Sequence, residues 1–112
     1  MNRNGLANLN IALPRDEIAA FCRRHHIRKL ALFGSVLRDD FRPDSDVDVL
    51  VEFEPGKTPD FFRFIDMQEE LSAILRHKVD LNTPGFLSRH FRQKVLDTAE
   101  VVYERAGRDA AA

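Results

Sequence analysis

Two aspartates separated by a single valine, Asp46 and Asp48, are the side chains in this sequence best suited to chemistry. They open the segment DVDVLVEF, in which polar and apolar residues alternate with the period of two typical of a β-strand. On such a strand both carboxylates point from one face, roughly 6–7 Å apart at the backbone. Carboxylates this close repel each other unless a cation lies between them, and their oxygens suit hard cations such as Mg²⁺. The pair therefore predicts a magnesium site, in which two ions about 3.5–4 Å apart would hold a phosphoryl group.

A second feature, Gly34-Ser35, ends the apolar segment IRKLALF over residues 27–33. Glycine lets the backbone approach a phosphate closely, and Ser35 offers a hydroxyl at the expected start of a short helix over residues 36–40, where anions are favoured. Arg38 lies one turn later and can bind phosphate oxygens with two N–H groups, or form a surface ion pair with a neighbouring aspartate. These residues predict a phosphate site beside the aspartate pair.

Length and composition limit the classes to which the protein can belong. The chain has 112 residues, of which 44% are hydrophobic and 31% charged, so we expect one soluble globular domain. Its 17 Lys and Arg and 18 Asp and Glu leave a net charge of −1, which argues against direct nucleic-acid binding. The single cysteine excludes an internal disulfide, and no apolar run reaches the roughly 18–20 residues of a membrane helix. With a polar, Asn-rich start that is unlike a signal peptide, we expect a cytoplasmic protein with no membrane partner.

The periodicity of apolar residues predicts four helices and four strands around one sheet. In chain order, we expect a helix from Pro14 to the basic cluster 23–26, a buried strand 27–33, the short helix 36–40, a loop 41–45, a strand 46–53, a helix from Asp60 to about His77, a strand 78–81, a turn 82–85, a helix around Leu87, Phe91 and Val95, and an edge strand 101–103. This order indicates an α/β (α+β) fold, a small mixed sheet flanked by helices, over residues 13–106. Residues 1–12 and 107–112 are expected to be flexible tails.

The long helix that begins near Asp60 carries a cluster of phenylalanines at its start. Asp60 is expected to cap the helix, and the apolar residues after it to form one buried face. We interpret the cluster mostly as core, with one ring possible on the surface for a partner. The residues expected on the buried face are Phe61, Phe64, Ile65, Leu71 and Leu75.

The segment LALFGSVLRDDFRPDSDVDVLVEF resembles the nucleotidyltransferase superfamily of DNA polymerase β, and more narrowly the minimal nucleotidyltransferase (MNT) antitoxins that are paired with HEPN-domain toxins. Ten residues separate Ser35 from Asp46, within the family's G-S-x(9–12)-D-x-D motif. Many members have Ala-Arg-Gly where this chain has Leu37-Arg38-Asp39, so the arginine is kept and the glycine is not. The resemblance covers nearly all of the chain from about residue 14 to 104 and implies a polymerase β-like nucleotidyltransferase fold.

The resemblance also implies an activity, the transfer of AMP from ATP to a hydroxyl, which in the toxin-paired branch belongs to a tyrosine of the HEPN partner. Gly34 and Ser35 would hold the triphosphate, and Asp46 and Asp48 would ligate two Mg²⁺ ions. The family's third acidic residue lies on a later strand, where this chain has Asp80. Asp80 would ligate the catalytic metal and help to deprotonate the hydroxyl. Such a protein is expected to form a hetero-oligomer with its toxin and to inactivate the toxin's ribonuclease.

Two other functions stay open at this stage. The protein could be an antitoxin that neutralises its toxin by binding alone, although a pure binder has no need of three carboxylates that converge. It could instead modify a small molecule, as aminoglycoside nucleotidyltransferases do, although one domain leaves little chain to enclose such an acceptor. The acceptor, the number of AMP units and the oligomeric state are not specified by the sequence.

Overall fold

The computed structural model describes residues 11–39 and 41–105. Its centre is a four-stranded sheet in the order β3-β2-β1-β4. Strand β1 (Ile27–Phe33) pairs antiparallel with both β2 (Val47–Phe53) and β4 (Glu100–Glu104), whereas β3 (Val79–Asn82) runs parallel to β2. The mixed sheet and the edge position of the last strand are as predicted. The tail expected over residues 1–12 falls largely outside the described residues, and that over 107–112 falls wholly outside them.

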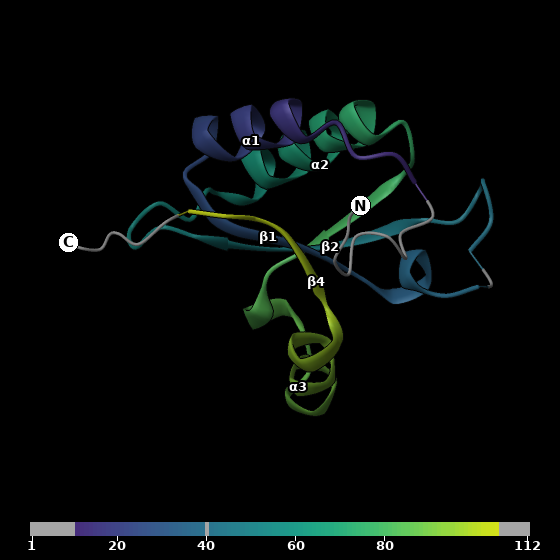
Figure 1. The fold of residues 1–112 in the computed structure, drawn as a ribbon. Coiled ribbons are helices and arrows are strands. Elements are labelled where there is room, and N and C mark those ends of the chain that lie inside the picture. Colours follow the sequence, from purple (N-terminus) through teal and green to yellow (C-terminus); the bar gives the residue numbers. More distant parts are fainter. Residues whose placement is uncertain (1–10, 40, 106–112) are drawn as a thin grey trace.

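Helices lie on both faces of this sheet (Figure 1). Helices α1 (Arg15–Arg24) and α2 (Phe61–Leu75) lie side by side on one face, and α3 (Arg89–Thr98) extends from the other. None of the helices in the described part of the chain is both long and apolar enough to span a membrane.

Local chemistry sets the ends of the helices. Pro14 precedes α1, and the acidic residues of its first turn and basic residues of its last turn match the helix dipole. Asp60 caps α2, because its side chain accepts a hydrogen bond from the backbone N–H of Arg63 at 2.8 Å. The helix ends at Arg76, whose φ of 59° places it in the left-handed region.

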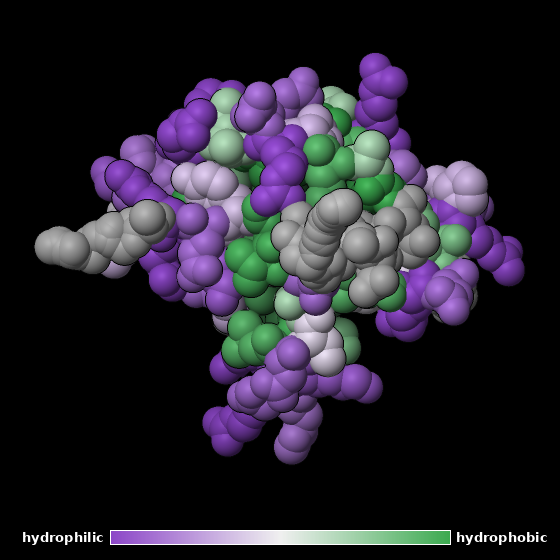
Figure 2. All heavy atoms as spheres, in the orientation of Figure 1, coloured by the Kyte–Doolittle hydropathy of each residue, from purple (hydrophilic) through white to green (hydrophobic). Residues whose placement is uncertain are grey.

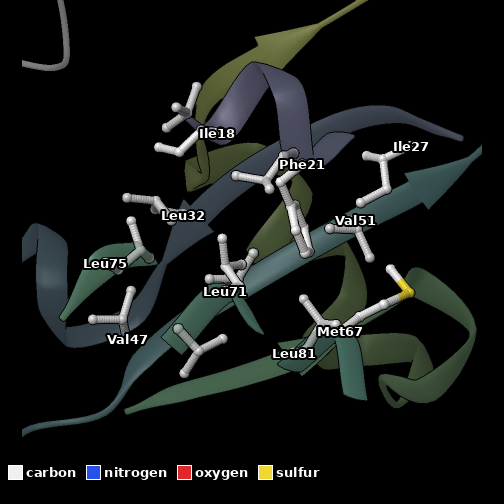
Figure 3. Packing of buried hydrophobic residues seen from close by; sticks show 14 of the residues in the cluster. Ile18, Phe21, Ile27, Leu32, Val47, Val51, Met67, Leu71, Leu75 and Leu81 are labelled. Atoms are coloured by element: carbon white, nitrogen blue, oxygen red, sulfur yellow. The ribbon is translucent and has the colours of Figure 1, made fainter. Parts of the chain in front are cut away.

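The main core lies between the sheet and the pair α1 and α2 (Figure 3). Alternate residues of the central strand β2, Val47, Val49 and Val51, point into it and are completely buried. Phe21 and Leu71 meet them from the two helices (Figure 3). The strand predicted over residues 46–53 is thus a central strand of the sheet, buried on the side of α1 and α2.

The predicted buried face of α2 is partly wrong. Phe64, Leu71 and Leu75 are buried, but the side chains of Phe61 and Ile65 are exposed at 68% and 38%. The buried stripe of α2 also includes Met67, and Phe61 and Ile65 stand four residues apart beside this stripe. The neighbouring ring, Phe62, is also 79% exposed. The phenylalanine cluster is therefore mainly a surface feature.

Two boundaries near the aspartate pair also differ from the prediction. In place of a helix over residues 36–40, the chain forms a 3₁₀ turn, η2 (Gly34–Leu37), because Arg38 takes an extended conformation that ends it. Strand β2 begins at Val47 and not at Asp46. Pairing stops there because β1 ends opposite Asp48 and β3 begins opposite Val47, so Asp46 has no strand beside it on either side.

Candidate active site

Asp48 and Asp80 are brought together by the pairing of β2 with β3. The parallel register places them directly opposite each other on neighbouring strands. Because Val47, Val49 and Val79 point into the core, the two carboxylates must lie on the other face of the sheet, away from α1 and α2. The two predicted site residues that lie 32 positions apart in sequence thus become neighbours.

Gly34 lies on the opposite side of Asp48 from Asp80. Phe33, the last residue of β1, pairs with Asp48, and Gly34 follows with a φ of +79°. A Cβ atom at position 34 would lie 2.2 Å from Oδ2 of Asp48, which is closer than any real contact. Glycine is therefore required here for two reasons, its left-handed backbone and the carboxylate packed against it. From the sequence, glycine was predicted here only because it lets the backbone approach a phosphate closely.

The environment of Asp48 favours the protonated form of its carboxyl. Its pKa is raised from an ordinary 3.8 to about 6, chiefly by burial and then by the negative charges of Asp80 and Asp46. A hydrogen bond between the side chains of Asp48 and Asp80 acts in the same direction, whereas the charge of Arg38 lowers the pKa. Three carboxylates and one guanidinium therefore share one electrostatic neighbourhood.

The remaining predicted residues surround this centre. Asp46 precedes β2 and is exposed, and Ser35 is half-buried within η2. Arg38 is exposed and follows η2, where its backbone N–H donates to the carbonyl of Ser35 at 2.9 Å. Because η2 is a short 3₁₀ turn, a phosphate there would meet the backbone and the hydroxyl of Ser35 rather than the dipole of a full helix.

The donor types suit a hard cation, since all three acidic residues offer carboxylate oxygens. Among residues 11–39 and 41–105, no three His, Cys, Asp or Glu side chains are gathered closely enough to hold an ion as they stand. Besides burial, the negative charges of Asp80 and Asp46 raise the pKa of Asp48, and the positive charge of a bound cation would offset this repulsion. The residues fit Mg²⁺ in their chemistry, and the Asp48–Asp80 hydrogen bond would have to open for both to bind it.

Two polar residues of α2, which sequence analysis did not single out, hold the strand that carries Asp80. The Oε1 atom of Gln68 accepts a hydrogen bond from the backbone N–H of Leu81 at 2.9 Å, and Oγ of Ser72 accepts one from that of Val79 at 3.0 Å. They thus satisfy backbone donors of an edge strand on both sides of Asp80. The only signal in the sequence is their spacing of four residues on one side of a helix.

A small second core lies beneath the site, on the face that carries the two aspartates. Phe33 and Leu50 come from the sheet, Leu87 from the turn before α3, and Val95 from α3 itself. This cluster fixes α3 next to the end of β1, which is where Gly34 begins.

Residues 15–102 match the nucleotidyltransferase domain family. The chain belongs to this family. The match covers most of the chain and includes every predicted site residue. The predicted nucleotidyltransferase superfamily and the prediction of an enzyme of this class are thereby confirmed.

Similar proteins include the protein adenylyltransferase MntA of Thermococcus cleftensis, which is 40% identical over 80 residues, 71% of this chain and 77% of the relative. A crystal structure of a toxin–antitoxin with AMP-PNP has a TM-score of 0.68 at 22% identity, over 84% of this chain and 76% of that one. A tri-AMPylated Shewanella oneidensis HEPN toxin in complex with MNT antitoxin matches with a TM-score of 0.56 at 22% identity, over 80% of this chain and 69% of that one. The two structures confirm the fold.

Proposed function

We propose that this nucleotidyltransferase moves AMP from ATP to a hydroxyl group, most simply a tyrosine, of a HEPN toxin and so acts as its antitoxin. The observation that carries the proposal is the row formed by Gly34, Asp48 and Asp80, three residues from three strand ends that touch or pair across the sheet. The MntA relative is named a protein adenylyltransferase, and HEPN toxins accompany antitoxins in structures of the same fold.

The proposed reaction uses each of these residues. Gly34 and Ser35 bind the phosphates of ATP, with Arg38 beside them. The acceptor oxygen attacks the α-phosphorus in line, the new O–P bond forms as the bond to the bridging oxygen breaks, and pyrophosphate leaves. Asp80 accepts the proton of the hydroxyl, which in a free tyrosine has a pKa near 10.

Asp46, Asp48 and Asp80 would hold two Mg²⁺ ions. Bound ions would supply positive charge beside the phosphates and the acceptor oxygen. The proposal gives a role to Asp46 and Asp80, whose negative charges act unfavourably on the carboxylate of Asp48 when no cation is bound.

A partner is needed to complete the site. Asp80 is exposed, on a four-residue strand at the edge of the sheet, in a small domain. We expect another molecule to present the acceptor, and the first candidate to test is a helical HEPN protein, sought among the products of the neighbouring genes.

The test mixes the chain with that neighbour-encoded protein, Mg²⁺ and ATP, and measures the intact mass of the neighbour. We expect a gain of one or more whole AMP units together with loss of its ribonuclease activity. Asp80→Asn should abolish the mass gain while leaving nucleotide binding largely intact, because it removes the proton acceptor and not the phosphate site. Asp66→Asn is the matched control, an exposed aspartate on α2 on the other side of the sheet.

Two outcomes would contradict the proposal. If the chain neutralises its neighbour without ATP and without any change in mass, it is an antitoxin by binding alone. If an aminoglycoside or another small molecule is modified and the neighbour is not, the protein belongs to the small-molecule branch.

A further inference from the structure

The short apolar stripe of α3 is only partly covered. Phe91 and Val95 stand four residues apart on one side of the helix, and Leu87 lies just before its cap residue, Ser88. Leu87 and Val95 are 8% and 3% exposed, whereas Phe91 is 49% exposed. The ring of Phe91 thus leaves an aromatic face open over part of its area, next to two buried apolar side chains.

The open ring lies at the proposed phosphate site. The Phe91 ring meets the ring of Phe33 edge to face, with centroids 6.4 Å apart and an interplanar angle of 69°. Phe33 is paired with Asp48 and is followed directly by Gly34. The half-exposed ring therefore stands one side chain away from both the glycine and the carboxylate.

The backbone that carries Phe91 is firmly held. Its N–H donates to Oγ of Ser88 at 3.3 Å, which caps the helix. The guanidinium of Arg92 donates to the carbonyls of Pro84 and Leu87 at 2.8 and 3.1 Å. The first turn of α3 is thus tied to the loop before it, so the ring is preorganised and would lose little freedom on binding a ligand.

We propose that Phe91, supported by Phe33, is the platform on which the base of the nucleotide stacks. The inference rests on the proposed function, since it deepens the ATP site at Gly34. A nucleoside triphosphate joins a flat aromatic base to a charged tail, and this face offers an aromatic ring beside a phosphate site. Stacking reads the plane of a base and not its hydrogen-bonding edge, so GTP would use the same platform.

The other exposed ring pair does not offer this combination. Phe61 and Phe62 also contact each other edge to face, with centroids 5.8 Å apart. They belong to the start of α2, on the opposite face of the sheet from Asp48 and Asp80. Figure 2 shows mainly hydrophilic residues at the bottom of the view, where α3 lies. Leu96 is a second exposed apolar residue of α3, at 41%, but it is not aromatic.

The test compares Mg-ATP with Mg-tripolyphosphate, which has the charged tail and no base, in calorimetric titrations. Phe91→Ala should weaken ATP binding about tenfold and leave tripolyphosphate binding unchanged. Phe91→Tyr, which keeps an aromatic face, should bind ATP within about twofold of the wild type. Leu96→Ala is the control on the same helix, because Leu96 is exposed to a similar degree and stands one residue outside the stripe.

A spectroscopic measurement tests the contact directly. The chain contains no tryptophan, so Phe91→Trp introduces a single fluorophore. Its emission should be quenched by ATP and by GTP but not by tripolyphosphate, with melting curves showing that the variant is folded. Quenching by tripolyphosphate to the same extent would mean that the ring reports phosphate binding and not a base.

The outcomes separate this inference from the proposed function. If the wild type binds neither ATP nor tripolyphosphate, both fail together. If the wild type binds both ligands and Phe91→Ala binds ATP equally well, only the platform fails. Equal loss of the two ligands, or loss of toxin binding with unchanged ATP affinity, would likewise overturn it, because Phe91 would then support the fold or contact the partner.

Discussion

The two faces of the sheet come from the same strands and have opposite characters. Towards α1 and α2, side chains of β2 such as Val49 are completely buried in a continuous apolar core. Towards α3, the same strand presents Asp48 beside a second, smaller core, in which four of the described side chains are buried. Because neighbouring residues of a strand point to opposite faces, one seven-residue strand can serve stability on one side and chemistry on the other.

This division explains how the protein tolerates a cluster of like charges. A half-buried carboxylate next to two others is unfavourable, as the raised pKa of Asp48 shows. This unfavourable free energy arises on the face towards α3. The face towards α1 and α2 supplies most of the buried apolar surface. Substitutions on the two faces should therefore differ in both the size and the sign of their effect on stability.

The largest difference should appear in a matched pair of core truncations. Leu71→Ala, in the core under α2, should lower the free energy of unfolding by about 3–5 kcal/mol, since it leaves a cavity among fully buried neighbours. Leu87→Ala, in the small core under α3, should lower it by only about 1–2 kcal/mol because its surroundings can collapse or admit water. Urea unfolding of both variants measures the two values. Equal losses of unfolding free energy would contradict the view that the core under α1 and α2 stabilises the fold more than the core under α3.

A smaller effect on stability is expected at Gly34, whose backbone packs against the carboxylate of Asp48. Gly34→Ala should lower stability by about 1–3 kcal/mol and weaken ATP binding, because the new Cβ both strains the left-handed backbone and displaces Asp48. Gly56→Ala is a close control, with a φ of +76° and no atom within 4 Å of the new Cβ, so it should show the strain alone. Gly34→Ala should cost more stability than Gly56→Ala, and this difference should become smaller when Asp48 is also replaced by alanine. An unchanged difference would mean that the contact with Asp48 is not its cause.

Loss of the hydrogen bond between Gln68 of α2 and the backbone of β3 should lower the free energy of unfolding by about 1 kcal/mol. Gln68→Ala leaves the N–H of Leu81 without its protein acceptor, so the edge strand that carries Asp80 should open more often. Hydrogen exchange of the Leu81 amide should accelerate, and AMP transfer should fall more than ATP affinity. Glu69→Ala, an exposed neighbour on the same helix, should change neither measurement.

The smallest expected effect has the opposite sign. In the folded protein the pKa of Asp48 is raised to about 6, above its unfolded value near 3.9, so the fold binds this proton more tightly and loses stability as the pH rises from about 4 through 6. Asp48→Asn in the presence of EDTA should therefore raise the melting temperature by a few degrees at pH 8, or about 1 kcal/mol after allowance for the exposure of the group to solvent. At pH 5 the gain should be much smaller. A gain of equal size at both pH values, or a loss at pH 8, would show that repulsion at Asp48 does not destabilise the fold.

Sequence alone was enough to predict the mixed sheet and the identity of the nucleotidyltransferase motif. Both depend on local rules, because the alternation after Asp46 and the apolar run before Gly34 mark the two strands, and ten residues fix the separation of their polar ends. Asp60 was predicted as a helix cap for the same reason, since a capping side chain bonds to a backbone N–H only a few residues away. The cap of α3, Ser88, was not predicted, because the helix was expected to include Leu87.

Only the tertiary structure decided which of these residues meet and which side chains stay outside. The register of β2 with β3 sets Asp48 opposite Asp80, and a shift of one residue would send one of them to the other face. The exposure of Phe61 and Phe91 depends on where α2 and α3 cross the sheet, which their own periodicity does not specify. The contact of Gly34 with Asp48 joins two strands through one missing Cβ. Local patterns encode which residues can form a strand or a helix, whereas proximity between distant residues arises only when those elements pack.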